Sequence, residues 1–134
     1  MRKPVVAVAV LLALVLVLCV SGCSRYNSHF RALLLITSDT SDSGYMKFSN
    51  FTGTKVFKFN CRKGALGDLE YSGFLEGGKA TVYYDDDGEK TELFTLEGGQ
   101  PEVNATAKVN PGTVYIIVET DGTCEEGKFS FKLR

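Results

Sequence analysis

The sequence has no tryptophan and a single histidine among its 134 residues. That histidine, His29, lies only six residues after Cys23, ahead of the aromatic-rich part of the chain. A domain without histidine excludes Ser-His-Asp and Cys-His catalysis and every histidine metal site. Phosphate-binding loops of the GxxxxGK[ST] or GxGxxG type are also missing, which excludes the common nucleotide sites. We therefore expect a chain that is not an enzyme and needs no nucleotide.

A strong excess of charge of one sign is also lacking. The whole chain has 15 Lys and Arg against 16 Asp and Glu, and removing Arg2 and Lys3 with a leader leaves 13 against 16. Such a mildly acidic chain, with no basic run, is predicted to be a poor partner for nucleic acid and for anionic lipid.

The N-terminus carries the one long apolar run. Arg2 and Lys3 precede an apolar stretch at residues 5–20, the order of charge and hydrophobicity found in secretory signals. At 1.5 Å per residue this stretch spans about 24 Å, less than the hydrocarbon thickness of about 30 Å. A removable leader is therefore favoured over a permanent membrane helix.

The leader ends in Val20-Ser21-Gly22-Cys23, which resembles the lipobox of bacterial lipoproteins. The resemblance implies that residues 1–22 are removed and that Cys23 carries a diacylglyceryl lipid. The protein would then be anchored in the bacterial cell membrane and face its extracytoplasmic side. The alternative is an ordinary signal peptide whose next cysteine forms a disulfide.

Two cysteines remain for the folded part. Cys61 and Cys124 form an isolated pair, and such a pair in an oxidising compartment is most often a disulfide. The bridge would close a loop of 63 residues between these two positions, for which chain entropy predicts about 4 kcal/mol of stabilisation. The sequence therefore predicts a bond between Cys61 and Cys124.

Short aromatic and β-branched runs separated by turn residues follow Gly44. Residues 45–51 and 55–61 flank Thr52-Gly53-Thr54, 69–75 and 80–85 flank Gly77-Gly78, and 113–120 and 128–133 close the series. In residues 55–61 and 128–133 apolar and polar side chains alternate, while residues 114–118 are apolar on both faces, as in a central strand. The pattern predicts an all-β fold, a small antiparallel, jelly-roll-like β-sandwich of seven to eight strands.

Residues 23–43 are predicted to be a lipidated tether ahead of a sandwich domain at 44–134. The polar composition of the tether is interrupted by the apolar stretch at residues 32–36. We favour a first strand there, packed on the domain, over a stretch that leans on the lipid surface.

The domain also resembles the bacterial pre-peptidase C-terminal type of β-sandwich. The resemblance is carried by an apolar strand that ends at an acidic turn, a Gly-Thr-Val-Tyr strand and a final Gly-aromatic strand, at residues 82–88, 111–118 and 127–131. It covers roughly fifty residues and implies a small sandwich used for binding beside secreted enzymes. Here the domain stands behind a predicted lipid anchor, without a protease domain beside it.

One dense acidic cluster stands out, at Asp85, Asp86 and Asp87 before Gly88. Three neighbouring carboxylates are candidate calcium ligands, although the spacing is not that of an EF-hand. The favoured interpretation is a solvated hairpin tip with Asp87-Gly88 as the turn, because both residues tolerate positive φ.

These features favour a membrane-anchored extracytoplasmic module that binds an envelope or extracellular protein or a glycan. An accessory or minimal glycosidase-type hydrolase is one alternative, and it would need two buried carboxylates beside a cleft. A structural envelope component with no ligand is the other. No ligand can be named from the sequence.

Overall fold

The computed structural model describes residues 25–134, so the predicted lipobox and Cys23 lie outside the described range. Within that range no helix is long and apolar enough to cross a membrane. Seven strands are formed: β1 (His29–Leu33), β2 (Ile36–Asp39), β3 (Ser43–Cys61), β4 (Asp68–Asp85), β5 (Thr91–Glu97), β6 (Val103–Lys108) and β7 (Gly112–Leu133).

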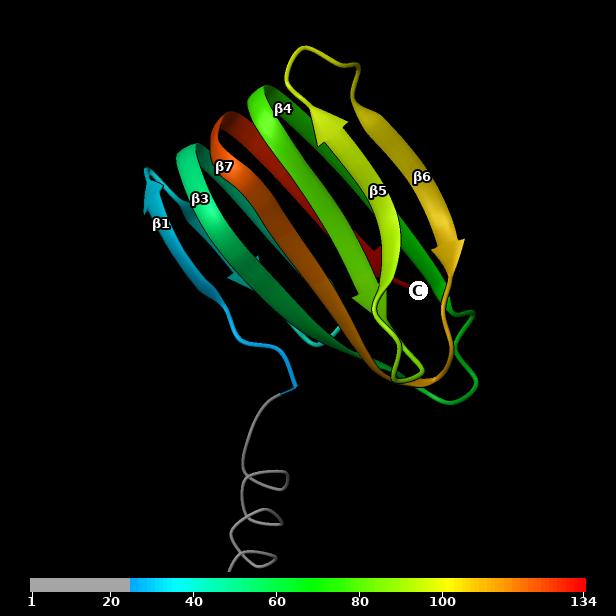
Figure 1. Cartoon of the computed structure of the whole chain (residues 1–134). Helices are drawn as coiled ribbons and strands as arrows, with labels where there is room; N and C mark the ends of the chain where they lie inside the picture. Colours follow the sequence, from blue (N-terminus) through cyan, green and yellow to red (C-terminus); the bar gives the residue numbers. More distant parts are fainter. Residues whose placement is uncertain (1–24) are drawn as a thin grey trace, which may run out of the picture.

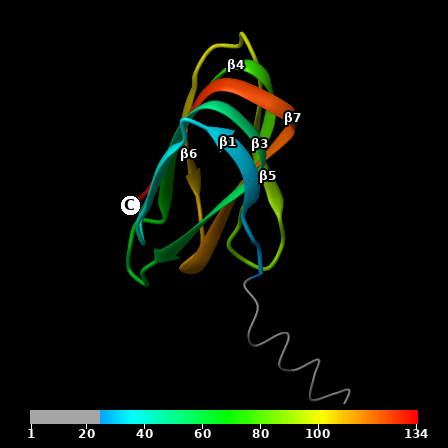
Figure 2. The same cartoon turned by 90° about the vertical axis from the view of Figure 1, so that its left-hand side faces the viewer.

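All seven strands join one antiparallel sheet, in the order β1-β3-β7-β4-β5, with β2 also paired to β3 and β6 also paired to β4. Strands β3, β4 and β7 are long, with 19, 18 and 22 residues. Each of them arches over one end of the molecule and continues in a second layer (Figures 1 and 2). The predicted all-β sandwich is confirmed, and it is made by folding a single sheet over on itself.

The fold gives two layers. The front layer faces the viewer in Figure 1 and contains β1, β5 and residues 54–61, 79–85 and 112–120 of the long strands. The rear layer contains β2, β6 and residues 43–51, 68–77 and 124–133. Each long strand passes from the front layer into the rear layer. The order β3-β7-β4 is therefore the same in both layers.

Each long strand bends at a glycine with positive φ. The values are 128° at Gly53, 91° at Gly78 and 74° at Gly122, and the strand pairing shifts register beside the first two. The prediction that Gly53 and Gly78 mark turns between separate strands is therefore wrong. These glycines mark bends inside continuous strands, because a positive φ serves a bulge as readily as a hairpin turn.

The core lies between the layers and is rich in phenylalanine. Phe57 and Phe59 point inward and Lys58 outward, as the alternation predicted. Phe129 and Phe131 fill the same space from β7. Every buried hydrophobic side chain among residues 25–134 lies between positions 46 and 133.

Strand β7 occupies the middle of the sheet, as its two apolar faces predicted. Val114, Ile116 and Val118 pack in the core, whereas Ile117 is 1% exposed on the outer side of the front layer. A strand that has neighbours on both edges and packed side chains on both faces has a continuous run of apolar residues in its sequence.

Residues ahead of Gly44 belong to the sandwich as well. β1 pairs with residues 50–54 of β3, and β2 pairs with residues 44–47. The single strand expected at 32–36 is not formed, because Leu34 and Leu35 make the turn between β1 and β2. The folded part therefore begins earlier than the predicted boundary at residue 44.

The predicted disulfide is not formed. Cys61 and Cys124 are both free and buried. Cys124 lies opposite Phe51 at the bend of β3, whereas Cys61 ends that strand opposite Gly112. Ten residues of extended chain, about 33 Å of path at 3.3 Å each, run from Phe51 to Cys61. The cysteine count suggested a pair, but the register places Cys124 beside the bend of β3 and Cys61 at the end of that strand.

Candidate functional site

The tip of the β4–β5 hairpin holds the three predicted calcium ligands. Asp85 is 2% exposed, and its Oδ1 accepts a hydrogen bond from the Gly88 amide at 2.7 Å. Asp86 Oδ2 accepts from the Asn110 amide at 2.7 Å, and Asp87 Oδ1 accepts from the Glu89 amide at 3.0 Å. The three carboxylates therefore serve three different backbone amides.

A calcium site is not formed at this tip. Within residues 25–134 no three His, Cys, Asp or Glu side chains are grouped so that they could hold a metal ion. Glu125 lies away from this tip, opposite Gly77 beside the bend of β4. The prediction of a hairpin with Asp87-Gly88 in its turn is confirmed, with φ of 101° at Gly88.

Asp85 also fixes the first described residues of the chain. Its Oδ2 accepts a hydrogen bond of 2.6 Å from the Tyr26 hydroxyl and lies 3.3 Å from Arg25 Nε. Arg25 also donates to the Gly88 carbonyl. Burial by itself would raise the pKa of Asp85, but the hydrogen bonds from Tyr26 and Gly88 and the Arg25 charge outweigh it and lower that pKa. Burial and the neighbouring carboxylate raise the pKa of Tyr26.

Several polar and aromatic side chains on the outer surface of the front layer contact one another. The Tyr26 ring packs edge-on against Tyr115, with centroids 5.1 Å apart. Lys90 Nζ lies 4.3 Å from the centre of the Tyr83 ring and 2.5 Å from Glu119 Oε1. These residues of the surface therefore contact one another, whereas Lys58 has no acidic partner within residues 25–134. Tyr83 lies on this surface while Tyr84 packs against the core, as the alternation predicted.

The outer surface of the rear layer is different. Tyr45, Ser130, Ser72 and Asn104 lie side by side in one row across β3, β7, β4 and β6. A second row joins Lys47, Lys128 and Phe74. Because Met46, Phe129 and Gly73 between these rows are buried, both rows point outward. We call the surface formed by Tyr45, Ser72, Phe74, Asn104, Lys128, Ser130 and Lys132 the rear face.

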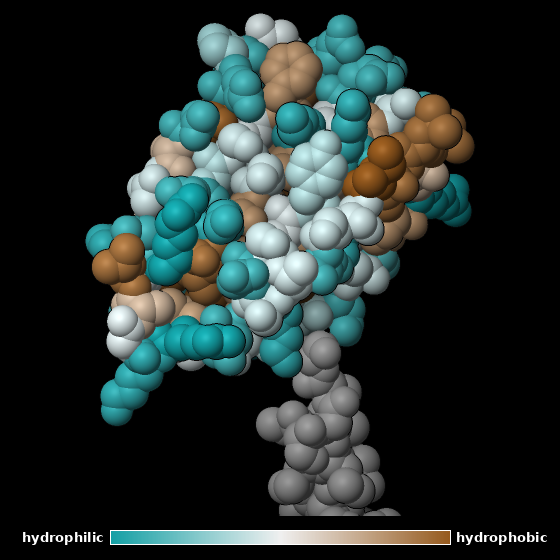
Figure 3. All heavy atoms as spheres, turned by 180° about the vertical axis from the view of Figure 1, so that it is seen from behind, coloured by the Kyte–Doolittle hydropathy of each residue, from teal (hydrophilic) through white to brown (hydrophobic). Residues whose placement is uncertain are grey.

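The rear face is open and polar. Figure 3 shows it as teal and white over its middle, with the hydrophobic colour gathered toward its edges. Phe74 is 39% exposed, and neither Lys128 nor Lys132 has an acidic partner within residues 25–134. A shallow hollow crosses this face, lined by Glu70, Tyr71, Ser72, Glu102, Asn104, Ser130 and Lys132.

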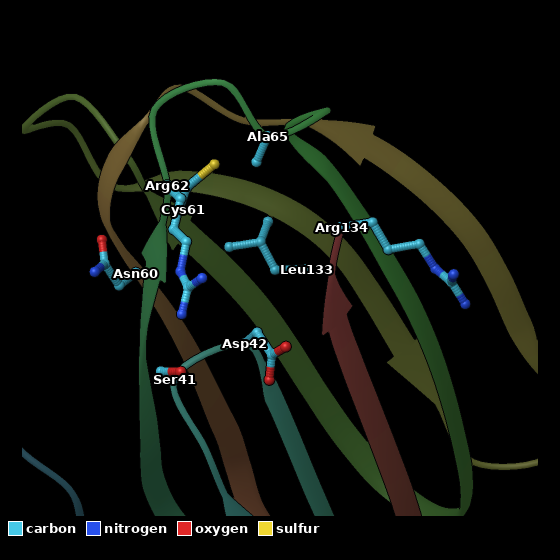
Figure 4. Close-up of a pocket in the computed structure, with 8 residues that line it drawn as sticks. All are labelled: Ser41, Asp42, Asn60, Cys61, Arg62, Ala65, Leu133 and Arg134. Carbon is cyan, nitrogen blue, oxygen red and sulfur yellow. The ribbon is translucent and has the colours of Figure 1, made fainter.

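A second hollow lies at the end of the sandwich opposite the bends. Figure 4 shows it between the layers, with Cys61, Arg62 and Leu133 on its walls. Backbone hydrogen bonds cross this end, from the Asn60 amide to the Ser41 carbonyl at 2.8 Å and from the Leu133 amide to the Asp42 carbonyl at 2.7 Å. These bonds tie the turn between β2 and β3 to strands β3 and β7, so the hollow is part of the closure of the sandwich.

The residues of the rear face were missed as a group by sequence reasoning. Alternation places Ser130 and Lys132 on the outward side of the last strand, and the same rule places Tyr45 outward beside buried Met46. What alternation cannot give is the register that puts Tyr45 beside Ser130. The face exists only because three long strands align there.

No known protein family and no curated protein matches the sequence. Among solved structures, the fold is similar to a family 29 carbohydrate-binding module complexed with mannohexaose, at 17% identity and a TM-score of 0.42, over 81% of this chain and 77% of that chain. It is also similar to the cupin domain of Drosophila melanogaster CENP-C, at 16% identity and a TM-score of 0.32, over 81% and 76% of the two chains. Neither likeness bears on what this chain binds.

Proposed function

We propose that the protein is a non-enzymatic binding module whose rear face binds a glycan, and that a lipid on Cys23 anchors it outside the bacterial cell membrane. The observation that carries the binding proposal is the contrast between the two outer surfaces. On the front layer Lys90 contacts both Tyr83 and Glu119, and Tyr26 packs against Tyr115. The rear face has side chains of the same kinds left open to solvent.

The chemistry of the rear face suits a carbohydrate. Tyr45 and Phe74 offer aromatic surface, and between them lie hydroxyl and ammonium groups on Ser130, Ser72 and Lys128. Aromatic rings bind apolar surface with defined geometry, and a small number of placed polar groups fixes the orientation of a ligand. A sugar presents both kinds of surface, with C–H groups on its ring faces and hydroxyls around its rim.

The hollow on the rear face does not favour hydrolysis. It contains two carboxylates, those of Glu70 and Glu102. Glu70 lies 3.0 Å from Arg134 Nε, and Glu102 is exposed. A glycosidase needs a carboxylic acid kept protonated in an apolar setting, and neither residue is placed in one. The same groups are suited to accept hydrogen bonds from a bound sugar.

The proposed anchor fits the position of the first described residues. Arg25 is held at the β4–β5 tip, two residues after Cys23. A lipid on Cys23 would then hold the domain close to the membrane with the rear face left free. Two long acyl chains make a stable anchor, at about 0.8 kcal/mol per buried CH₂ group.

The binding test uses a lipid-free chain from residue 23 to 134 with Cys23→Ser, applied to an array of immobilised glycans. We expect retention on a defined subset, with affinity at least about tenfold weaker in Tyr45→Ala and in Phe74→Ala. Tyr83→Ala, which removes a ring from the front layer, is the matched control and should bind like the parent. Retention that is unchanged in both rear-face variants, or no retention on any glycan, would refute the proposal.

The anchor is tested separately in the producing cell. Mass spectrometry of the mature protein should find Cys23 at the N-terminus with a diacylglyceryl group. An intact chain with an unmodified Cys23 would exclude the anchor and leave the glycan proposal untouched.

A further inference from the structure

The edge of the sandwich formed by β1 and β2 exposes apolar side chains. Phe30, Leu33, Leu34 and Ile36 are 40%, 62%, 81% and 62% exposed. Only two other large hydrophobic residues within 25–134 are exposed, and they lie apart from each other on β4 and in the loop after β3. Figure 3 shows hydrophobic colour gathered at the upper right, where the β1–β2 edge lies in that view. A contiguous apolar group of this kind marks an interaction surface more often than scattered single residues do.

Leu34 at the centre of this group is held in a conformation that leucine disfavours. Its φ is 52°, and Glu126 is the one other non-glycine residue with positive φ in the described range. The left-handed region costs a residue with a Cβ about 1 kcal/mol or more, and an exposed leucine gains little from burial in return. Glycine or asparagine would serve the backbone better here. The side chain of Leu34 is therefore suited to contact something outside the domain.

The same edge is basic. Residues 29–61 contain four basic residues (Arg31, Lys47, Lys55 and Lys58) and two acidic residues (Asp39 and Asp42). Arg31, Lys47 and Lys58 have no acidic partner within residues 25–134. The opposite edge, residues 86–108 with β5 and β6, has six acidic and two basic residues. The chain therefore has a small net charge although its two edges carry charge of opposite sign.

We infer that the β1–β2 edge is a docking surface for an anionic lipid bilayer. Leu33, Leu34 and Ile36 would enter the interface between headgroups and acyl chains, while Arg31 and Lys47 lie at the height of the phosphates. Apolar area buried in the interface and attraction to anionic lipid together set the strength of such binding. The inference goes beyond the proposed anchor and needs no lipid on Cys23.

Charge also decides between a bilayer and a second copy of the chain. Two copies packed through Leu34 and Ile36 would bring their Arg31 and Lys47 side chains toward each other. Like charges facing across an interface disfavour association, whereas phosphate headgroups attract both residues.

The test measures flotation of the Cys23→Ser chain, residues 23–134, with vesicles of phosphatidylcholine and phosphatidylglycerol in a two-to-one ratio. We expect binding that weakens with added salt and is absent on pure phosphatidylcholine. Leu34→Asn should weaken binding about tenfold and leave thermal stability unchanged or higher, because asparagine tolerates positive φ. Arg31→Ser should weaken it about fivefold.

Lys79→Ser is the matched control, because it removes the same charge from the front-layer half of β4. It should bind vesicles like the parent chain, and neither edge variant should change retention on glycans. Vesicle binding that is unchanged in both Leu34→Asn and Arg31→Ser, or no binding of the parent chain to the anionic vesicles, would overturn the inference. Sedimentation that shows a dimer dissociated by Leu34→Asn would also overturn it and assign the edge to a second copy.

Discussion

Tyr26 donates a hydrogen bond of 2.6 Å to Asp85 across 59 residues of sequence, and it joins the start of the described chain to the tip of the β4–β5 hairpin. Asp85 is thereby a structural residue. Its carboxylate, predicted as a candidate calcium ligand, is satisfied by a phenol, a backbone amide and a guanidinium.

Removing this carboxylate should destabilise the domain. Asp85→Ala leaves the Gly88 amide and the Tyr26 hydroxyl without their acceptor, and the loss of a buried partner costs about 1 to 3 kcal/mol. Asp87→Ala is the matched control, because Asp87 is exposed and bonds one exposed amide, and it should stay within about 0.5 kcal/mol of the parent. Urea denaturation measures both, and equal effects would contradict the assigned role of Asp85.

The same contact predicts how stability depends on pH. The pKa of Asp85 is lowered in the folded state from its ordinary 3.8. The folded state therefore favours the ionised carboxylate more than the unfolded state does. Its contribution is present above the unfolded pKa and is lost as the pH falls through the lower folded pKa. The difference in unfolding free energy between the parent and Asp85→Asn should therefore shrink below about pH 4. A difference that is constant from neutral to acid pH would contradict this.

The two thiols should stay reduced and unreactive in the folded domain. Cys124 Sγ donates a weak hydrogen bond to the Lys79 carbonyl at 3.3 Å, and burial raises the pKa of that thiol. Slow labelling by a thiol reagent is expected before unfolding, and two labelled thiols after it in the Cys23→Ser chain. Reducing agent should not shift the melting temperature. A mass of the mature protein that is two hydrogen atoms lower, located to Cys61 and Cys124, would contradict this and show that the disulfide forms.

The bend glycine Gly78 should tolerate no side chain. Its φ is 91°, and an added Cβ would lie 2.7 Å from the Thr123 carbonyl oxygen and 2.8 Å from the Cys124 Cα atom. Gly78→Ala should cost about 2 kcal/mol or more of stability. Gly64→Ala is the control, with a similar φ of 93° but no atom within 4 Å of the added Cβ, and it should cost only about 1 kcal/mol. Equal melting temperatures of the two variants would count against the folded-over sheet.

Alternation along single strands correctly predicted the inward Phe57 and Phe59 and the two-sided burial of residues 114–118. Local sequence could not predict whether the chain turns back or continues at Gly53 and Gly78, because the same backbone freedom serves both. Whether the chain turns or continues at these glycines depends on pairing between strands that are distant in sequence. The separation of Cys61 from Cys124 and the composition of the rear face depend on the same pairing.

The most direct test of glycan binding by the rear face is a titration of the isotope-labelled Cys23→Ser chain with an oligosaccharide retained on the array, followed by the backbone amide signals. The predicted result is a set of shifts centred on Tyr45, Ser72 and Ser130, with the signals of Tyr83 and Tyr115 unmoved. Shifts confined to the front layer, or to the hollow around Cys61 and Arg62, would contradict it.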